Sequence, residues 1–530
     1  MMQERYQVII VGGGPVGVAL AVELAQRDIS CAVVERHLEV GRIPKGQNLT
    51  QRTLEHFYFW NCVDQLRAAR LLPPDYPIGG LTAYGSLAGE YWYVPPGLEQ
   101  VQSYHFQDNE RLPQYLTEQV LRTRLTQLES ATTKFGWTAK SIEQDVVEVR
   151  VTIAGEEWPY DEMEIAGDYV VGCDGARSLV RSQLGIVREG PDFGDRMALL
   201  VFRSRELHEG LKRFPERTTY RVLRPELQGV WQFFGRVDVG ETWFFHGPVP
   251  VTTTVKDTDY LHDMLEEAAG FPLNVEFEHI GFWDLRVEVA TTYRVGRGFI
   301  AGDASHSHPP YGGFGLNTGL EDITNLGWKL AANLQGWGGD ALLDSYSEER
   351  QPVFKETGEK VIAGGILKDR EFLNTFSPEK DLAKFLEQWS QRTSGDSAGP
   401  TYEPNYAGST VVFGPEGAVN GATGRYTFLA QAGHHLAPVT LSSGKNVYEE
   451  LGGVFTLLAF DADEEVVRVF EAVAERRNLA LKIVIDSFLD QRAQLGSRLV
   501  LVRPDQFVCW AGDALTDEPD AIFARVTGSD

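Results

Sequence analysis

The sequence has few cysteines and no long apolar run, and these absences exclude several classes of protein. Its 530 residues contain four scattered cysteines, Cys31, Cys62, Cys173 and Cys509, and no C-x-x-C pair. This pattern predicts free thiols in a reducing compartment, with neither a disulfide framework nor a cysteine metal site. No apolar stretch approaches the roughly 18 residues of a membrane span, and the first strand begins too early for a signal peptide. We therefore expect a cytoplasmic protein without a membrane partner.

Positive charge is also scarce. Lys and Arg number 49 against 75 Asp and Glu, which gives a formal net charge of −26. Such an acidic chain is disfavoured as a partner for nucleic acid or for an anionic membrane. The length, with 43% hydrophobic residues, instead predicts a globular protein of about three domains.

The N-terminal stretch carries the pattern of a dinucleotide-binding fold. Residues 8–11 form a short apolar run typical of a buried parallel strand. Residues 16–25 carry apolar side chains at helical spacing, and residues 31–34 give a second buried strand. This order predicts a strand, a helix and a parallel strand with a ligand at the first turn.

Three glycines and one acid complete this pattern. Gly12, Gly14 and Gly17 have the spacing G-x-G-x-x-G, and Glu35 ends the second strand. Gly12 permits the tight turn, Gly14 lets a pyrophosphate approach the backbone, and Gly17 lets the helix lie close to the strand. Glu35 can accept hydrogen bonds from a ribose hydroxyl pair. The motif alone does not separate NAD from FAD.

A second candidate ligand-binding stretch follows residue 296. Asp303 lies at the end of a short apolar run, where open α/β sheets bind ligands. Glycines and prolines over 309–315 predict a rigid loop, which leads into a helix with one apolar face. Such a loop can stabilise negative charge on a ligand. His306 and His308 lack a third ligand at matching spacing, so no metal site is expected.

Residues 190–290 change character. Strand-like runs rich in aromatic residues predict a mostly antiparallel sheet, inserted between two parts of the dinucleotide fold. Most of these aromatic side chains are expected to pack in a core. A sheet with one aromatic face is also a natural wall for a flat apolar ligand.

The C-terminal part is predicted to be a separate unit. Residues 400–425, rich in Gly, Pro and Thr, predict a linker. Strands at 454–460 and 482–486 flank a helix, and a hairpin follows over 498–510. This order resembles a thioredoxin-like domain, and without a C-x-x-C pair it predicts packing or dimerisation instead of thiol chemistry.

With these stretches the chain resembles the class A flavin-dependent aromatic hydroxylases, the p-hydroxybenzoate hydroxylase and phenol hydroxylase family. The resemblance covers residues 6–360 by motif, and the C-terminal unit is similar to the extra domain of the phenol hydroxylase branch. Three motifs carry it: Gly12-x-Gly14-x-x-Gly17 with Glu35-Arg36, the run Cys173-Asp174-Gly175-Ala176-Arg177-Ser178, and the run from Gly302-Asp303 through Pro309-Pro310 to Gly315-x-Asn317.

We therefore predict an α/β fold: a Rossmann-like FAD-binding domain with an inserted antiparallel-sheet substrate domain and a C-terminal thioredoxin-like domain. The FAD-binding domain is expected over 1–187 and 280–400, with 72–110 contributing to the substrate side. The substrate domain is expected over 188–279 and the C-terminal domain over 401–530.

The resemblance implies roles at the nucleotide end of FAD. Glu35 would hold the adenosine ribose, with Arg36 near the adenine. Gln114 would bind the ribityl region, Asp303 the ribityl chain and the pyrophosphate side, and Asp174 would lie near the pyrophosphate and be linked to NAD(P)H use.

The resemblance also implies roles around the flavin ring and the pyrophosphate. Pro310 would sit beside the ring where oxygen reacts, and the loop at Gly315 would turn the backbone N–H groups of Leu316 and Asn317 toward the pyrimidine end. The family often has Arg where this chain has Lys45, which leaves open whether Arg42 or Lys45 contacts the pyrophosphate.

The implied activity is that of an oxidoreductase, an FAD-dependent monooxygenase. It would hydroxylate a phenolic or heteroaromatic ring with NAD(P)H and O2, through a flavin C4a-hydroperoxide. A phenol reacts better as phenolate, so His246 and Tyr220 on the aromatic sheet are candidates for a base or relay. Alternatives are a flavin epoxidase, a polyketide aromatic-ring hydroxylase, or a flavoprotein that binds an aromatic compound without turnover. A homodimer is expected from the resemblance.

Overall fold

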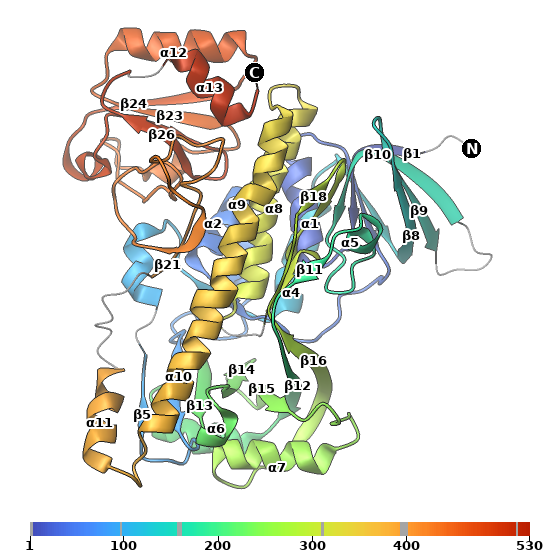
Figure 1. Ribbon diagram of the computed structural model, residues 1–530, viewed down its shortest axis with the longest axis vertical. Helices are drawn as coiled ribbons and strands as arrows, with labels where there is room; N and C mark the ends of the chain where they lie inside the picture. Colours follow the sequence, from blue (N-terminus) through green and yellow to red (C-terminus); the bar gives the residue numbers. More distant parts are fainter. Residues whose placement is uncertain are drawn as a thin grey trace.

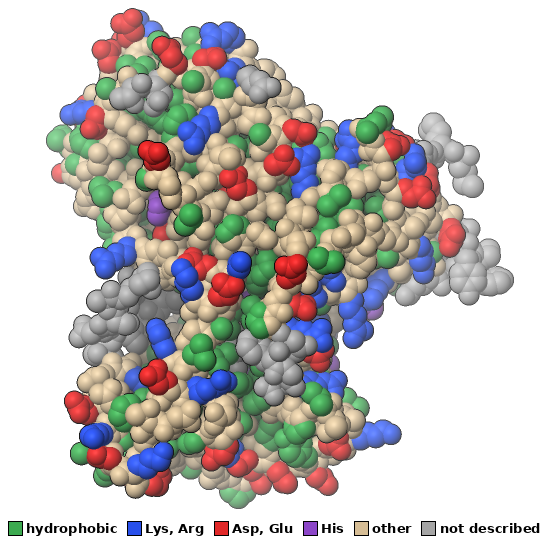
Figure 2. Space-filling view, in the orientation of Figure 1, with side chains coloured by type: hydrophobic (Ala, Val, Ile, Leu, Met, Phe, Trp, Pro, Cys, Tyr) green, Lys and Arg blue, Asp and Glu red, His purple; other side chains and the backbone are tan. Residues whose placement is uncertain are grey.

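The computed structural model contains two large sheets joined by long helices, with a smaller C-terminal domain beside them (Figure 1). It describes residues 4–95, 98–155, 162–308, 312–392, 401–515 and 518–529. Within these ranges, no helix combines the length and apolarity that crossing a membrane requires. On the face in Figure 2, acidic and basic side chains are interspersed, with no large area of one sign.

The first sheet is the dinucleotide-binding sheet. Its parallel centre orders β19, β10, β1, β2 and β7, and its outer strands pair antiparallel. The predicted strand, helix and strand at the N-terminus are confirmed. The strands are β1 (Glu4–Val11), β2 (Cys31–Glu35), β7 (Ala131–Phe135), β8 (Trp137–Gln144), β9 (Val149–Gly155), β10 (Glu162–Gly172), β18 (Arg294–Val295) and β19 (Gly298–Ile300).

Three helices pack on this sheet, α1 (Pro15–Ala25), α4 (Gln114–Leu125) and α8 (Phe314–Leu334), and α1 contacts both of the others. The predicted helix after the 309–315 loop is α8, and its apolar face is confirmed, because Leu320, Ile323, Leu326 and Leu330 are buried in the sheet's core. Shorter elements complete this region: α2 (Gln51–Phe59), α3 (Val63–Ala68), α5 (Leu179–Gln183), and the pair β3 (Asn48–Leu49) and β6 (Glu110–Arg111).

The second sheet is the substrate-side sheet, and all its pairs are antiparallel except β13 with β4. Strand alternation separates its two faces. One face packs under α6 (Arg205–Gly210) and α7 (Thr258–Ala269), and the other faces the first sheet. The order is β16 (Glu276–Arg286), β12 (Asp192–Arg203), β15 (Thr242–Val249), β14 (Gln232–Arg236), β13 (Thr219–Leu223), β4 (Gly80–Tyr84) and β5 (Trp92–Tyr93).

A long helical path connects the two sheets. It runs through α9 (Asp340–Glu356), the π-helical η5 (Thr357–Ala363) and α10 (Gly364–Thr375), and α11 (Leu382–Gln391) packs near its end (Figure 1). On α10, Asp369 pairs with Arg221 of β13 at 3.2 Å and also with Arg392. The path therefore fixes the substrate-side sheet against the nucleotide fold.

The expectation of a linker over 400–425 was wrong. Residues in this stretch form an antiparallel pair, β21 (Thr401–Asn405) and β22 (Gly421–Gly424), against α9. The Glu356 carboxylate accepts the backbone N–H groups of Ala422 and Thr423, and Tyr406 is fully buried. The segment is anchored because its backbone donors are satisfied by a helix from another domain.

The C-terminal domain has the predicted thioredoxin-like order. Its sheet runs β24 (Leu481–Asp486), β23 (Phe455–Phe460), β25 (Leu499–Val502) and β26 (Val508–Gly512), with only β23 and β24 parallel. Helices α12 (Glu464–Arg476) and α13 (Pro519–Thr527) cover it.

A buried ion cluster joins this domain to α8 and α9. Arg503 donates to both carboxylate oxygens of Glu349, at 2.7 and 3.0 Å, and Lys329 lies 2.7 Å from the same carboxylate. All three side chains are inaccessible to solvent. Burial lowers the pKa of Lys329 to about 8, while Arg503 and Lys329 hold the pKa of Glu349 below its ordinary value despite burial.

We predict that Glu349→Gln lowers the free energy of unfolding by about 3 kcal/mol, because two buried cations then lose a shared carboxylate. Chemical denaturation followed by tryptophan fluorescence measures the change. The control is Asp344→Asn on the same helix, whose pair with Arg294 is solvent-exposed on the aspartate side and should cost less than about 1 kcal/mol. Equal effects of the two variants would contradict the role given to the buried cluster.

Candidate functional site

Two adjoining cavities open at the carboxyl ends of β1, β10 and β19. The larger is about 1250 Å³ and lies between the dinucleotide-binding sheet and the substrate-side sheet. The smaller is about 520 Å³ and lies over the first turn of the fold. Gly14, Lys45 and Gln114 line both, so together the cavities form one elongated site.

Glu35 lies at the end of the smaller cavity. One carboxylate oxygen accepts the backbone N–H of Gly13 at 2.7 Å, and the other accepts that of His37 at 2.8 Å. Each oxygen keeps a further lone pair. Arg36 lines the same end. These contacts fix the carboxylate where a ribose hydroxyl pair could reach it.

The three motif glycines differ in their surroundings. A Cβ on Gly12, whose φ is +106°, would lie 2.3 Å from the carbonyl oxygen of Cys173, and one on Gly17 would lie 1.9 Å from that of Gly12. A Cβ on Gly14 would meet no atom within 4 Å. Gly12 and Gly17 are therefore required by the fold, whereas Gly14 keeps space open at the start of α1.

Asp174 also lines the smaller cavity, but its carboxylate is engaged in the fold. It accepts the hydroxyl of Ser178 at 2.5 Å and the backbone N–H of Leu179 at 2.7 Å, at the start of α5. These bonds hold the loop after β10 in place. Of the two candidate cations in the loop after β2, Lys45 lines both cavities and Arg42 lines neither.

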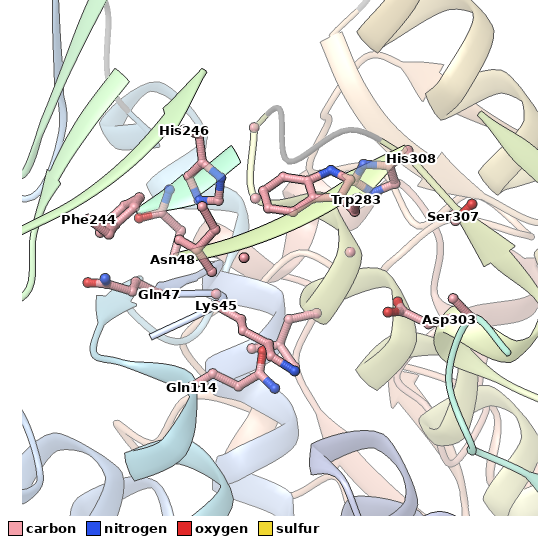
Figure 3. Close-up of a pocket in the computed structure, with 18 of the residues that line it drawn as sticks. Lys45, Gln47, Asn48, Gln114, Phe244, His246, Trp283, Asp303, Ser307 and His308 are labelled. Carbon is pink, nitrogen blue, oxygen red and sulfur yellow. The ribbon is translucent and has the colours of Figure 1, made fainter. Parts of the chain in front are cut away.

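Asp303 follows β19, and its carboxylate points into the larger cavity (Figure 3). The side chain is exposed to the cavity, and desolvation by the surrounding protein raises its pKa, whereas the charges of His306, Lys45 and Arg188 act in the opposite direction. His306 is held away from the cavity's centre by a 2.7 Å contact between its Nε2 and Asp322.

The start of α8 closes one end of the larger cavity. Gly315 and Leu316 line it, and the first-turn N–H groups of α8 have no partners within the helix. The Asn317 side chain faces inward and is saturated: it accepts from Thr50 N and Thr53 Oγ1 and donates to the carbonyls of Asn48 and Gly313. Pro310 lies outside the described residues.

The opposite wall is aromatic and is contributed by the substrate-side sheet. His246 stacks on Phe233 with ring centroids 4.8 Å apart and contacts the edges of Phe244 and Trp283 (Figure 3). Its Nδ1 has no hydrogen-bond partner among the described residues. Burial lowers the pKa of His246 to about 3, so the imidazole is neutral at physiological pH.

The structure does not bring Tyr220 to this wall. Tyr220 is 1% exposed and packs in the core on the far face of the sheet, with Trp243 and Phe214. Its neighbours Thr219 and Arg221 line the cavity instead. The alternation of the strand therefore removes Tyr220 as a candidate base or relay.

Sequence reasoning missed several residues of the larger cavity, among them Gln47, Asn48, Arg111 and Trp283. Asn48 and Arg111 form the short pair of β3 with β6, directly before the predicted Gln114 helix. The closeness of Arg111 to Gln114 in the sequence was the one signal that could have placed it at the site. Gln47 is buried, and neither polar atom of its side-chain amide has a partner among the described residues.

The site fits FAD. The space at Gly14, the fixed Glu35 carboxylate and the Asp303 carboxylate exposed to the cavity suit a pyrophosphate flanked by two hydroxylated chains. The larger cavity then has room for a flat ring beside the start of α8 and for a second ligand against the aromatic wall.

Comparisons with known proteins agree with this geometry. The family model described as "FAD binding domain" matches residues 5–360, and "Aromatic-ring hydroxylase, C-terminal" matches residues 430–529. The FAD-dependent monooxygenase apdD of Emericella nidulans is 29% identical over 99% of this chain and 90% of that protein. The 4-methyl-5-nitrocatechol 5-monooxygenase of a Burkholderia species is also 29% identical, over 97% and 95%. The solved structure of the rebeccamycin biosynthetic enzyme RebC with reduced flavin has a TM-score of 0.82, 26% identity and full coverage of both chains.

We predict that Gly14→Ala folds normally but loses FAD, because its Cβ meets no protein atom yet fills the approach to the α1 N-terminus. Thermal unfolding of the FAD-free protein and flavin fluorescence during FAD titration measure the two effects. The matched variant Gly12→Ala should fail at folding, since its Cβ would collide with the Cys173 carbonyl. Normal FAD affinity in Gly14→Ala would disprove the assignment of this turn.

We predict that buried His246 makes the fold acid-sensitive. The unfolded imidazole takes up a proton near pH 6.5, whereas the folded one has a pKa of about 3. Between these values the unfolded state binds more protons, so the free energy of unfolding falls as pH is lowered, by about 1.4 kcal/mol per pH unit from this group.

Urea unfolding between pH 7 and pH 4 tests this sensitivity in His246→Phe, whose stability should fall less steeply. The control Phe233→Leu removes a neighbour that does not titrate. It should shift the whole stability curve without changing its slope. An unchanged slope in His246→Phe would refute the prediction.

Proposed function

Because the chain belongs to the family of FAD-dependent aromatic-ring monooxygenases, we propose that it hydroxylates a phenolic or heteroaromatic ring with NAD(P)H and O2. The observation that carries this proposal is the larger cavity, with the nucleotide fold on one side and an aromatic wall on the other. The nitrocatechol substrate in the name of the Burkholderia relative supports a phenolic ring.

In this proposal FAD spans both cavities, with its adenosine end in the smaller cavity and its ribityl chain and ring in the larger one. Glu35 and Arg36 hold the adenosine end, and Lys45 neutralises the pyrophosphate beside Gly12 and Gly14. Gln114 and Asp303 bind the ribityl chain, and the N–H groups at Leu316 and Asn317 meet the ring. FAD, when bound and reduced, supplies the oxygen-activating chemistry.

The aromatic wall orients the substrate ring and excludes water. Phe233, Phe244, His246 and Trp283 offer a stacked and edge-on apolar surface to a planar ligand. His246 takes part as a neutral imidazole that can hydrogen-bond a ring hydroxyl, because its pKa of about 3 makes it a poor base at neutral pH. A dry cavity protects reactive species from water.

The partners follow from the same proposal. NAD(P)H acts as a co-substrate without a domain of its own, since the sequence carries one G-x-G-x-x-G motif. The four cysteines, all free and three of them buried, support a reducing cytoplasm. A homodimer is the proposed assembly.

The test is NAD(P)H consumption by the FAD-loaded protein with phenols, hydroxypyridines and larger polycyclic phenols. Oxygen uptake and hydrogen peroxide are followed in the same assay. We expect a true substrate to stimulate NAD(P)H oxidation at least about tenfold, with one O2 consumed per NAD(P)H and little peroxide. Comparing NADH with NADPH identifies the electron donor.

The Gly14→Ala variant serves as the flavin-free control and should oxidise no NAD(P)H. Stimulation that yields only peroxide would mean that the ring is an effector and not a substrate. No stimulation by any ring, in protein that retains FAD, would overturn the proposed reaction while leaving the family assignment intact.

A further inference from the structure

Arg111 places a buried positive charge in the wall of the larger cavity. Its side chain is 1% exposed, and within the described chain no carboxylate forms an ion pair with it. The guanidinium donates to Asn48 Oδ1 and, at 3.4 Å, to the carbonyl oxygen of Arg236, and it lies 5.7 Å from the centre of the Phe244 ring. All of these partners are neutral groups.

An uncompensated buried cation is costly, because protein around it replaces water without supplying an opposite charge. Burial lowers the pKa of Arg111 to about 9 for this reason. The other arginines of the cavity wall are partly exposed or paired with acids: Arg177, Arg188, Arg196, Arg221 and Arg286. Arg111 is therefore the buried cation of this wall that a ligand's negative charge would compensate.

Asn48 is the residue through which Arg111 can act on a ligand, because it accepts a hydrogen bond from Arg111 and also lines the cavity. A guanidinium can only donate hydrogen bonds, so the Asn48 atom facing Arg111 is the amide oxygen, and the NH2 group must face the other way. Asn48 Nδ2 lies 3.5 Å from the position that a Cβ on Gly313 would take, at the start of α8. Among the described residues it donates to no acceptor. Figure 3 shows the Asn48 side chain beside His246 and Phe244.

The side chains around Arg111 and Asn48 indicate which kind of ligand would fit there. Phe244 lies under Arg111 and against His246, which in turn stacks on Phe233. A planar aromatic ring fits beside these side chains, and an ionised oxygen on that ring would meet the Asn48 amide. The field of Arg111 acts strongly there, because protein and not water surrounds the buried guanidinium.

We propose that Asn48 and Arg111 form a binding site for a negatively charged oxygen of the aromatic substrate, so that the ring binds as a phenolate. The Asn48 N–H donates to the phenolate oxygen, and Arg111 is the positioning residue that orients this amide and supplies the opposite charge. A phenol that binds in this way releases one proton to the solvent. The inference rests on the proposed function for its aromatic substrate.

The test uses 4-nitrophenol, whose absorbance reports its own ionisation, with the FAD-loaded protein and without NAD(P)H. Difference spectra across a pH series give the apparent pKa of the bound phenol. We expect it to lie about one to three units below that of free nitrophenol in the wild type. Proton release in weakly buffered solution provides a second readout.

Three variants separate the effect of the charge from that of packing. Arg111→Met removes the cation and should return the pKa of bound nitrophenol to its free value or above. Asn48→Asp keeps nearly the same shape and gives Arg111 an internal carboxylate. It should therefore abolish the shift while keeping the melting temperature at or above that of the wild type. Arg111→Lys should retain part of the shift.

The control is Arg203→Met, which removes an exposed cation of the substrate-side sheet, paired with Glu241 at the surface. It should leave the pKa of bound nitrophenol unchanged. If Asn48→Asp keeps the wild-type shift, Arg111 has only a packing role and the inference fails. It fails equally if the wild type binds nitrophenol in its neutral form or not at all.

A third result would also overturn it: Arg111→Met weakening FAD affinity with no effect on nitrophenol would assign the compensating charge to the flavin. These measurements need no turnover. A protein that binds phenolates but oxidises no NAD(P)H would leave the inference standing and the proposed function refuted. Turnover without any ionisation shift would refute the inference and leave the proposed function standing.

Discussion

Helix α8 carries a row of buried polar side chains on which the docking of the loop after β19, of α9 and of α2 depends. Asp322 accepts hydrogen bonds from Gly302 N, His306 and Arg350, and so fixes the loop after β19 to α9. Glu321 binds Arg52 and His56 on α2. Each of these buried charges needs its partner, because desolvation would otherwise cost several kcal/mol. The helix therefore specifies how the surrounding elements dock.

The same helix begins at the candidate flavin site, so fold and function share one element. Gly313, with φ +71°, precedes its first turn and leaves room for Asn48 beside it. Asn317 then ties this turn to the loop after β2 through Thr50 and Thr53. A site built in this way keeps its N–H donors aimed before any ligand arrives, which reduces the cost of ordering them on binding.

The local pattern was sufficient to predict the nucleotide fold. Gly12, Gly17 and Glu35 act through short-range geometry that a motif encodes directly, and the structure has the predicted strands and helix around them. The buried ion cluster has no such local signature, because nothing near Glu349 in the chain indicates that its carboxylate is fully buried. Whether a charge is buried depends on partners far along the chain, such as Arg503, and no local pattern contains them.

The substrate-side sheet shows a second feature that the sequence alone could not predict. Alternation tells us that Tyr220 points away from Thr219 and Arg221, but not which face meets the cavity. That choice depends on where the sheet docks, and the pairing of β13 with β4 could not be read from either strand alone.

The protein as a whole is negatively charged, whereas the cavity wall contains a buried positive charge, Arg111. At a formal net charge of −26 the protein repels anions at long range, an effect that salt weakens beyond about 10 Å. Within the cavity wall, Arg111 is buried, and no carboxylate of the described residues pairs with it. If the substrate binds at Asn48 and Arg111 as proposed, a neutral phenol approaches without repulsion and loses its proton only once it is bound. Under that proposal, the acidic overall charge and the buried cation together favour substrates that become anionic inside the site over those that are already anionic in solution.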